Sequence, residues 1–176
     1  MVASRTPFAA ALAVSDMALQ FAPDADIQVK WPNDVRIHRA KLSGILIETG
    51  GSGADTWVAA GMGINVTHAP DGAGQSATSI AALRGDTAVD AGMVLDALRD
   101  AFSARLVQAR AGFAALRESW LERAEGLGGL IRVTASGEPV DGIFEDMDET
   151  GGLILRLPDG TRQTIRAGDV DLIGRV

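Results

Sequence analysis

Apolar side chains spaced at helical intervals predict a buried helix near the start of this chain. Between Pro7 and Phe21, the bulky residues Phe8, Leu12 and Met17 recur among alanines, which indicates a well-buried helix that begins near Pro7. A proline two residues after Phe21 ends it.

A second helical region lies in the middle of the chain. Residues 78–80 (TSI) open a short helix that ends near Gly85, and a longer helix follows from about Ala88. The apolar residues of this region fall at steps of three and four. We assign them to the core and to no ligand; they include Leu95, Leu98, Phe102, Leu106, Phe113, Leu116 and Trp120.

Between the helical regions the pattern changes to that of β-strands. Residues 27–31 alternate apolar and polar side chains, which predicts a strand with one buried face. Trp31 precedes Pro32 and therefore favours extended geometry, and the Asn33-Asp34 pair has the chemistry of a turn. We expect this turn to carry both polar side chains off the end of the strand.

A hairpin is expected next. It comprises a short strand or excursion, a buried strand, a glycine loop and a partner strand, at residues 35–40, 42–47, 50–53 and 56–60. The segment from Gly61 to Gly63 is expected to interrupt the partner strand, which resumes at residues 64–66. Residues 67–77 are expected to form a mobile loop.

Beyond the glycine-rich residues 126–129 the period is strand-like. Five short strands separated by turn signals are expected, at residues 130–135, 140–144, 153–157, 162–165 and 170–173. Strands this short and this closely spaced suggest a small antiparallel barrel that leans on a larger unit. We therefore predict a larger domain at residues 1–126 and a barrel at residues 127–176.

Composition narrows the class of protein. The 176 residues are 47% hydrophobic and 22% charged, as in an average globular protein. The net charge of -7 argues against binding to nucleic acid or an anionic membrane, which requires a basic face. The lack of cysteine excludes disulfides, a thiolate nucleophile and Cys-ligated metal sites. Residues 1–5 lack the pattern of a secretory signal, so we expect a cytoplasmic location.

Several common catalytic groupings have no support. His38 and His68 are the only histidines, and both have polar neighbours typical of a surface. The acidic run at residues 145–149 fits no established metal loop and indicates a solvated turn. The segment from Gly61 to Gly63 is not a dinucleotide-binding fingerprint, because Val66 stands where the third glycine would be.

The remaining candidates combine lysine, asparagine, aspartate and glycine. A lysine at the entrance to an apolar strand either binds a carboxylate or phosphate or extends its ammonium group to solvent. Glycines on neighbouring strands let a flat ligand or another backbone approach. An asparagine at a strand end can read an adenine edge. The residues are Lys30, Asn33, Asp34, Lys41, Gly44 and those at 61–65.

Three ordered motifs resemble those of the biotin–protein ligases. Residues 30–34 (KWPND), 41–48 (KLSGILIE) and 61–65 (GMGIN) match the family patterns K-W-P-N-D, K-x-x-G-I-L-x-E and G-x-G-I-N. Residues 78–80 resemble the family's T-S-[IL] helix start, and residues 120–173 its linker and C-terminal barrel. The resemblance implies an α+β fold. A class II synthetase-like catalytic domain, with a mixed or antiparallel sheet packed with helices, would precede a small SH3-like barrel.

The resemblance also implies a reaction in two steps. Biotin and Mg-ATP would give biotinyl-5′-AMP and pyrophosphate, and the biotinyl group would then pass to a lysine of a carboxylase's biotin carboxyl carrier domain. Lys41 would be the catalytic residue, in contact with the biotin carboxylate and the α-phosphate. Gly44 and Leu46 would line the biotin pocket together with Lys41.

The adenylate-binding residues follow from the same resemblance. They would be Asn33, Asp34, Gly61, Gly63, Ile64 and Asn65. Asn33 and Asp34 would in addition lie near the phosphates and the magnesium ion. Which of the two contacts the metal, and whether directly or through water, stays open, and we assign the metal to Asp34. Lys30 and Trp31 would either contact the ligand or brace the turn.

One departure from the family pattern bears on activity. Family members carry, ahead of the region matched here, a Gly-Arg-rich loop that folds over the adenylate, together with Ser/Thr and Gln residues that bind the biotin ureido group. This sequence has no such segment. We therefore expect a truncated catalytic domain with impaired or absent adenylation, and exposed sheet edges that favour association, for example as a homodimer.

Other functions remain open. A catalytically impaired remnant that only docks carrier domains would bind them without ATP. A lipoate or octanoyl ligase uses related chemistry, although residues 30–34 and the appended barrel favour biotin. A role as a DNA-binding repressor is disfavoured by the acidic charge and by the lack of DNA-binding helices before residue 1.

Overall fold

The computed structural model describes residues 3–70, 76–86, 88–134 and 138–173. The helices are α1 (Thr6–Phe21), α2 (Ile80–Arg84), α3 (Ala91–Ala111) and α4 (Ala114–Leu121), with 3₁₀ turns at Ala3–Arg5 and Gly53–Asp55. The strands are β1 (Ile27–Lys30), β2 (Asp34–Ile37), β3 (Ala40–Gly50), β4 (Trp57–Ile64), β5 (Leu130–Thr134), β6 (Val140–Met147), β7 (Leu153–Arg156), β8 (Arg162–Ile165) and β9 (Asp169–Leu172). None of the described helices is both long and apolar enough to cross a membrane.

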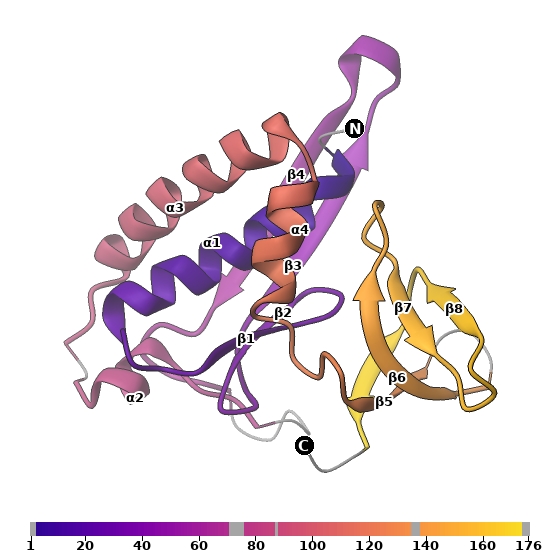
Figure 1. Ribbon diagram of the computed structural model, residues 1–176. Coiled ribbons are helices and arrows are strands. Elements are labelled where there is room, and N and C mark those ends of the chain that lie inside the picture. The colour runs from indigo at the N-terminus through magenta and orange to yellow at the C-terminus, as the bar shows by residue number, and fades with distance from the viewer. Residues whose placement is uncertain (1–2, 71–75, 87, 135–137, 174–176) are drawn as a thin grey trace.

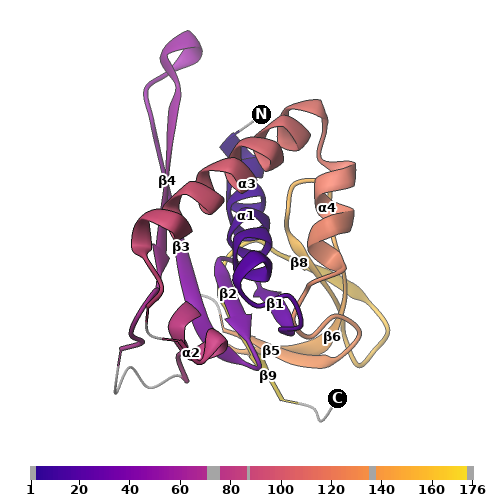
Figure 2. The same cartoon turned by 90° about the vertical axis from the view of Figure 1, so that its left-hand side faces the viewer.

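The first sheet is antiparallel, with the strand order β1-β2-β3-β4. Helix α1 packs against all four strands, and α3 lies against α1 on the side away from the sheet (Figures 1 and 2). The predicted helix from Pro7 to Phe21 is thus confirmed. Its many alanines are buried because α1 is enclosed between the sheet and other helices, which leaves little room for larger side chains. The β3–β4 hairpin extends beyond the helices (Figure 1).

The second sheet holds the five strands predicted for the C-terminal part, all antiparallel, in the order β8-β7-β6-β5-β9. It is strongly curved, and the last strand returns beside the first (Figure 1). The linker between the sheets runs along β1: Val29 N–H donates to Arg123 O at 2.8 Å, and Glu125 N–H donates to Val29 O at 2.9 Å. The expected α+β class is confirmed, whereas the division at residues 126 and 127 stays a prediction.

The predicted interruption of the partner strand at Gly61 to Gly63 is wrong, because β4 runs without a break from Trp57 to Ile64. Gly61 pairs with Leu46 and Gly63 pairs with Gly44 on β3. The backbone pairing of β3 with β4 continues through these glycines. Their lack of side chains therefore leaves the surface of the sheet uncovered there and does not end the strand.

Two other expectations need correction. Helix α3 begins at Ala91 and not near Ala88, because the Asp90 carboxylate accepts a hydrogen bond from Met93 N–H at 3.1 Å and caps the helix. Leu95 on α3 and Leu46 on β3 are each 63% exposed, so neither belongs to the core. The short helix is as expected, with Ser79 as its N-cap and Gly85 in left-handed conformation at its end. Of the predicted loop at 67–77, residues 71–75 lie outside the described residues.

Asp16 joins three parts of the helical layer. Its carboxylate on α1 accepts hydrogen bonds from Arg105 of α3 at 2.6 and 2.9 Å, and from Arg123 of the linker at 2.8 Å. Partial burial alone would raise the pKa of Asp16, but the two guanidinium groups outweigh it and hold the pKa below its ordinary value. The network therefore stabilises the fold at neutral pH and weakens as Asp16 becomes protonated in acid.

Replacement of Ser43 by alanine is expected to leave the protein equally stable or more stable. Ser43 is 2% exposed, and its hydroxyl has no hydrogen-bond partner among the described residues. A buried, unsatisfied hydroxyl costs about 1–3 kcal/mol, so its removal should raise the free energy of unfolding by up to roughly 1 kcal/mol after the small loss of packing. Urea denaturation measures this difference, and a clear loss of stability would mean that the hydroxyl is satisfied in solution.

Candidate functional site

Several of the predicted site residues lie on the face of the first sheet opposite α1. Lys30, Asp34, Gly44 and Gly63 pair in one row across the four strands. In the neighbouring row, Val29 and Val35 belong to the hydrophobic core, Ile64 packs against it, and Ser43 is buried. Because successive residues of a strand point to opposite faces, the first row points away from the helix.

A β-bulge brings Lys41 onto this open face. Val35 pairs with Ser43 and Arg36 pairs with Lys41, so Leu42 is the extra residue on β3. Lys41 and Gly44 are three positions apart and would point to opposite faces of a regular strand, but the bulge changes the alternation. The Lys41 ammonium group consequently reaches the Asp34 carboxylate, with Nζ and Oδ1 2.7 Å apart.

The ion pair leaves Lys41 partly accessible. Its side chain is 36% exposed and that of Asp34 is 12% exposed. A Cβ atom at Gly44 would lie 3.3 Å from Lys41 Nζ and 3.6 Å from Asp34 Oδ1, so Gly44 is the floor directly beneath the pair. Asp34 thus fixes the position of a lysine whose charge still faces solvent, which suits the binding of an anion.

A cavity of about 250 Å³ adjoins this ion pair. It is lined by Lys41, Leu42, Ser43, Gly44, Gly63, Asn65, Pro70 and Ala77. Four of the predicted residues therefore share one cavity: Lys41, Gly44, Gly63 and Asn65. Asp34 lies next to it through its ion pair with Lys41.

The other predicted residues lie around the cavity and do not line it. Leu46 and Gly61 pair with each other further along the β3–β4 hairpin, where both are exposed. Ile64 packs toward the core, so only its backbone could face a ligand. Asn33 is exposed, and its amide Nδ2 donates to Ile45 O at 2.9 Å, while Ile45 N–H donates to Asn33 O at 2.9 Å. This reciprocal pair holds the β1–β2 turn, residues 31–33, against β3.

Asn65 closes one side of the cavity through its backbone contacts. Its amide Nδ2 donates to Lys41 O at 3.3 Å and to Thr78 O at 3.0 Å. Lys41 N–H donates to Ser76 O at 2.8 Å, and Thr78 N–H donates to Lys41 O at 3.0 Å. Both amide hydrogens of Asn65 are engaged, so it would read an adenine edge only through its oxygen unless these bonds were exchanged.

Sequence reasoning missed Pro70 and Ala77, which line the cavity from the segment predicted as a loop. The sequence feature that came closest to indicating them was the helix start at residues 78–80, because it marks where the predicted loop at residues 67–77 ends. Ala77 forms an isolated parallel bridge with Lys41. Nothing in the local sequence indicates that pairing, because it joins residues far apart in the chain.

Of the two residues left open at the motif start, Trp31 braces the structure. It is 4% exposed, and its indole Nε1 donates to Gly151 O at 3.1 Å. Lys30 lies near Asp171 of β9, with Nζ and Oδ1 4.0 Å apart. Both residues therefore connect the first sheet to the C-terminal sheet.

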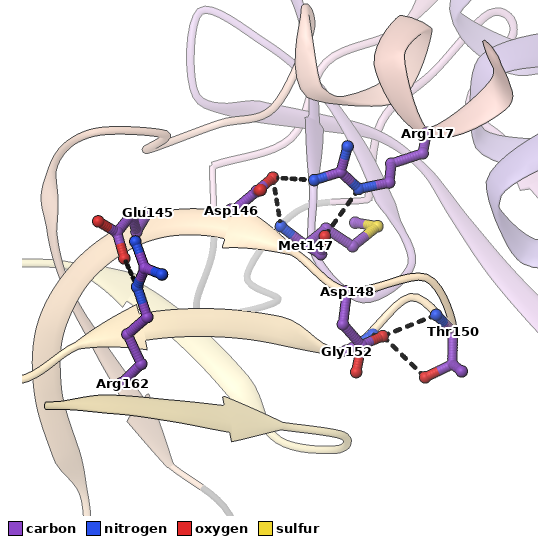
Figure 3. Close-up of polar contacts among 8 residues, drawn as sticks. All are labelled: Arg117, Glu145, Asp146, Met147, Asp148, Thr150, Gly152 and Arg162. Atoms are coloured by element: carbon purple, nitrogen blue, oxygen red, sulfur yellow. Dashed lines mark hydrogen bonds and ion pairs between the residues drawn. The ribbon is translucent and has the colours of Figure 1, made fainter. Parts of the chain in front are cut away.

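The solvated turn predicted for the acidic run at residues 145–149 is wrong for Glu145 and Asp146, because both lie in β6. Glu145, Asp146 and Asp148 make protein contacts (Figure 3). Glu145 pairs with Arg162 at 2.6 Å, and Asp146 pairs with Arg117 of α4. The hydrogen bond from Arg162 lowers the pKa of Glu145. Among the described residues, no three His, Cys, Asp or Glu side chains gather closely enough to hold a metal ion.

Both parts of the chain match known protein families. Residues 5–65 match the biotin/lipoate A/B protein ligase family, and residues 126–173 match the biotin protein ligase C-terminal domain. The chain is 41% identical to a biotin–[acetyl-CoA-carboxylase] ligase of Paracoccus denitrificans, over 97% of this chain and 73% of that protein. It is 37% identical to the enzyme of the same name from Mycobacterium tuberculosis, over 92% of this chain and 60% of that protein.

Solved structures share the fold. The apo biotin protein ligase of Aquifex aeolicus superposes with a TM-score of 0.81 at 24% identity, covering 96% of this chain and 74% of that one. The same enzyme in complex with biotin and ATP superposes with a TM-score of 0.79, covering 96% and 70%. These structures show the fold, and the 41% identity to the Paracoccus enzyme, which extends over nearly the whole chain, shows that the protein belongs to the biotin–protein ligase family.

Proposed function

We propose that this chain catalyses the ATP-dependent activation of biotin and the transfer of the biotinyl group to a carrier-domain lysine. The observation that carries the proposal is Lys41, held by Asp34 at 2.7 Å above Gly44 and beside the cavity. A positioned ammonium group beside a residue without a side chain suits a reaction in which a carboxylate must approach a phosphate. The names of the curated relatives support biotin as the acid that is activated.

In the first step, a carboxylate oxygen of biotin attacks the α-phosphorus of ATP. The bond from that phosphorus to the oxygen bridging to the β-phosphate breaks, and pyrophosphate leaves. The Lys41 ammonium group would lie between the carboxylate and the α-phosphate and reduce their repulsion as negative charge builds up. In the second step, the neutral amine of the carrier lysine attacks the acyl carbon of biotinyl-5′-AMP. AMP leaves, and the proton of the amine passes to solvent.

The proposed binding roles are those that the motif resemblance implies. Biotin would lie along β3, against Lys41, Gly44 and the backbone of Leu46. The adenylate would lie across Asn33, Asp34 and the strand end that carries Gly61, Gly63, Ile64 and Asn65. Support comes from the space over Gly61 and Gly63, where the nearest non-adjacent atoms to an added Cβ lie 3.8 and 3.7 Å away.

Magnesium would be held by Asp34 together with phosphate oxygens. One carboxylate next to a phosphate-binding lysine fits this ion, which usually keeps several waters and takes one or two carboxylates plus substrate phosphates. The ion would supply charge neutralisation on the phosphates. Asp34 itself would have two tasks, since its Oδ1 atom also orients Lys41.

The acceptor would be the biotin carboxyl carrier domain of a carboxylase, and a cytoplasmic location and the lack of nucleic-acid or membrane partners remain part of the proposal. A homodimer is also proposed, because β4 is the last strand of the first sheet among the described residues. The two-domain division at residues 126 and 127 completes the proposal.

The test is an adenylation and transfer assay with the Paracoccus denitrificans relative as the reference enzyme. The chain is incubated with biotin, α-³²P-labelled ATP and magnesium, then with a purified carrier domain. Labelled biotinyl-5′-AMP and biotin on the acceptor lysine are expected, formed more slowly than by the reference enzyme, with no product on a carrier whose acceptor lysine is replaced by arginine. A rate well below the reference would confirm the expected impairment.

Two outcomes would count against the proposal. Preference for lipoate or octanoate over biotin would assign the chain to the related ligases. Carrier binding that is independent of ATP, with no adenylate at any protein concentration, would make it a docking module.

A further inference from the structure

We infer that the β6–β7 turn, residues 148–152, positions the phosphate-facing end of the β1–β2 turn through Trp31. The inference rests on the proposed function and extends it, because it assigns a task in ligand binding to a residue of the C-terminal sheet. The element concerned is Gly151, which contacts Phe8 of α1 and Trp31 of the ligase motif.

Hydrogen bonds among its own residues hold the β6–β7 turn (Figure 3). Asp148 Oδ1 accepts hydrogen bonds from Thr150 N–H at 2.8 Å, from the Thr150 hydroxyl at 2.7 Å and from Gly152 N–H at 2.8 Å. Burial alone would raise the pKa of Asp148, but these donors outweigh it and lower the pKa below its ordinary value. The conformation of the turn is therefore stabilised by hydrogen bonds among its own residues.

The tip of this turn packs against Phe8 and Trp31 of the larger unit, a contact that we call the seat. Gly151 has a φ of 90°, and a Cβ atom there would lie 2.3 Å from Phe8 Cζ and 2.4 Å from Phe8 Cε2. Phe8 cannot easily move away, because its ring packs edge-on against Phe113 at 5.2 Å and Trp120 at 5.9 Å between centroids. Only glycine fits between the turn and this aromatic cluster without displacement.

Trp31 connects the seat to the candidate site. Gly151 O accepts the indole hydrogen of Trp31, which is buried and so has no alternative partner in solvent. Asn33, two residues after Trp31, is hydrogen-bonded to Ile45 of β3. The next residue, Asp34, forms the ion pair with Lys41. The Trp31 indole and the three residues that follow it therefore connect the tip of the β6–β7 turn to the ion pair of Asp34 with Lys41.

A separate contact attaches the C-terminal sheet to the helices. Arg117 Nε of α4 donates to Met147 O at 2.7 Å, and its guanidinium group pairs with Asp146 (Figure 3). This anchor needs neither Trp31 nor Gly151. A substitution at Gly151 can therefore disturb the seat while the two sheets stay attached, and the positioning role can be separated from simple docking.

The experiment compares Gly151→Ala with Gly160→Ala. Gly160 in the β7–β8 turn also has a positive φ, of 84°, but an added Cβ there would meet nothing within 4 Å. Both substitutions place an alanine at a similar positive φ, and only the first collides with Phe8. We expect Gly151→Ala to raise the KM for ATP in adenylation about tenfold or more, since small misplacements in an active site can cost up to 10²-fold, and Gly160→Ala to have little effect.

Hydrogen exchange gives a readout that is independent of activity. Backbone amides of residues 31–36 should exchange faster in Gly151→Ala than in Gly160→Ala, while those of α3 stay unchanged. Trp31→Phe, which removes the indole donor, should show the same local change. Phe8→Leu combined with Gly151→Ala should recover part of the KM, because it frees space for the new methyl group.

The inference is overturned if Gly151→Ala and Gly160→Ala behave alike in exchange at residues 31–36. The inference is also overturned if the two variants lose the same thermal stability and Gly151→Ala keeps an unchanged KM for ATP, because the contact would then be structural only. If the unsubstituted protein forms no biotinyl adenylate, the proposed function fails, and the exchange comparison still decides whether the seat orders the turn.

Discussion

Replacement of Lys41 by methionine is expected to lower the rate of biotinyl adenylate formation roughly 10²- to 10³-fold, the range seen when one preorganised charge-stabilising group is removed. Methionine keeps much of the length of the side chain and removes its charge. Two unit charges 4 Å apart near a protein surface interact by about 4 kcal/mol, so an uncompensated carboxylate and phosphate would oppose their own reaction by a comparable amount. Pyrophosphate exchange in the presence of biotin measures the adenylation step directly.

Two further variants separate this role of Lys41 from general effects. Arg110→Ala removes one positive charge from the exposed end of α3 and should leave the rate unchanged. Lys41→Arg keeps the charge and the ion pair with Asp34 but changes the geometry, and should retain part of the activity. Circular dichroism and thermal melting check that loss of the partner of Asp34 has not unfolded the protein. Near-normal exchange by a folded Lys41→Met protein would remove Lys41 from the mechanism.

Most of the fold could be predicted from the sequence because its elements carry local signals. The alanine-rich helix, the hairpin around residues 50–53 and the five short C-terminal strands all follow from periodicity and turn residues. The errors occurred where local pattern and pairing disagree. Gly61 and Gly63 have the composition of a strand break, but their partners on β3 continue the ladder. Leu95 has helical spacing, but its side of α3 is exposed.

The candidate site was predictable as a set of motifs and not as a geometry. Residues 30–34 and 41–48 could be singled out, but the bulge at Leu42 that turns Lys41 toward Asp34 depends on the register between two strands. The contact of Trp31 with Gly151 joins residues 120 positions apart. Such long-range contacts leave no periodic trace in the sequence, so the choice between ligand contact and bracing for Trp31 needed the structure.

A residue outside every motif is expected to matter most for stability. Glu125 lies in the linker beside β1, and its side chain is 2% exposed. Both of its carboxylate oxygens accept hydrogen bonds from Arg36 Nη1, at 3.2 and 3.1 Å, and the Arg36 side chain is 15% exposed. Arg36 Nε is buried and has no hydrogen-bond partner among the described residues, so this guanidinium group depends on Glu125 for compensation of its charge.

Replacement of Glu125 by leucine should therefore destabilise the fold by about 3–5 kcal/mol, the usual cost of leaving one member of a buried ion pair without its partner. For a chain of this length the melting temperature should fall by roughly 10 °C, as measured by calorimetry. The matched control is Asp141→Leu, which breaks the solvent-exposed pair of Asp141 with Arg132 and should change the melting temperature little. The double variant Arg36→Met, Glu125→Leu should recover most of the loss, because it removes both charges. If Glu125→Leu costs no more than Asp141→Leu, water must reach Arg36, and the linker does not rely on this pair to stay on β1.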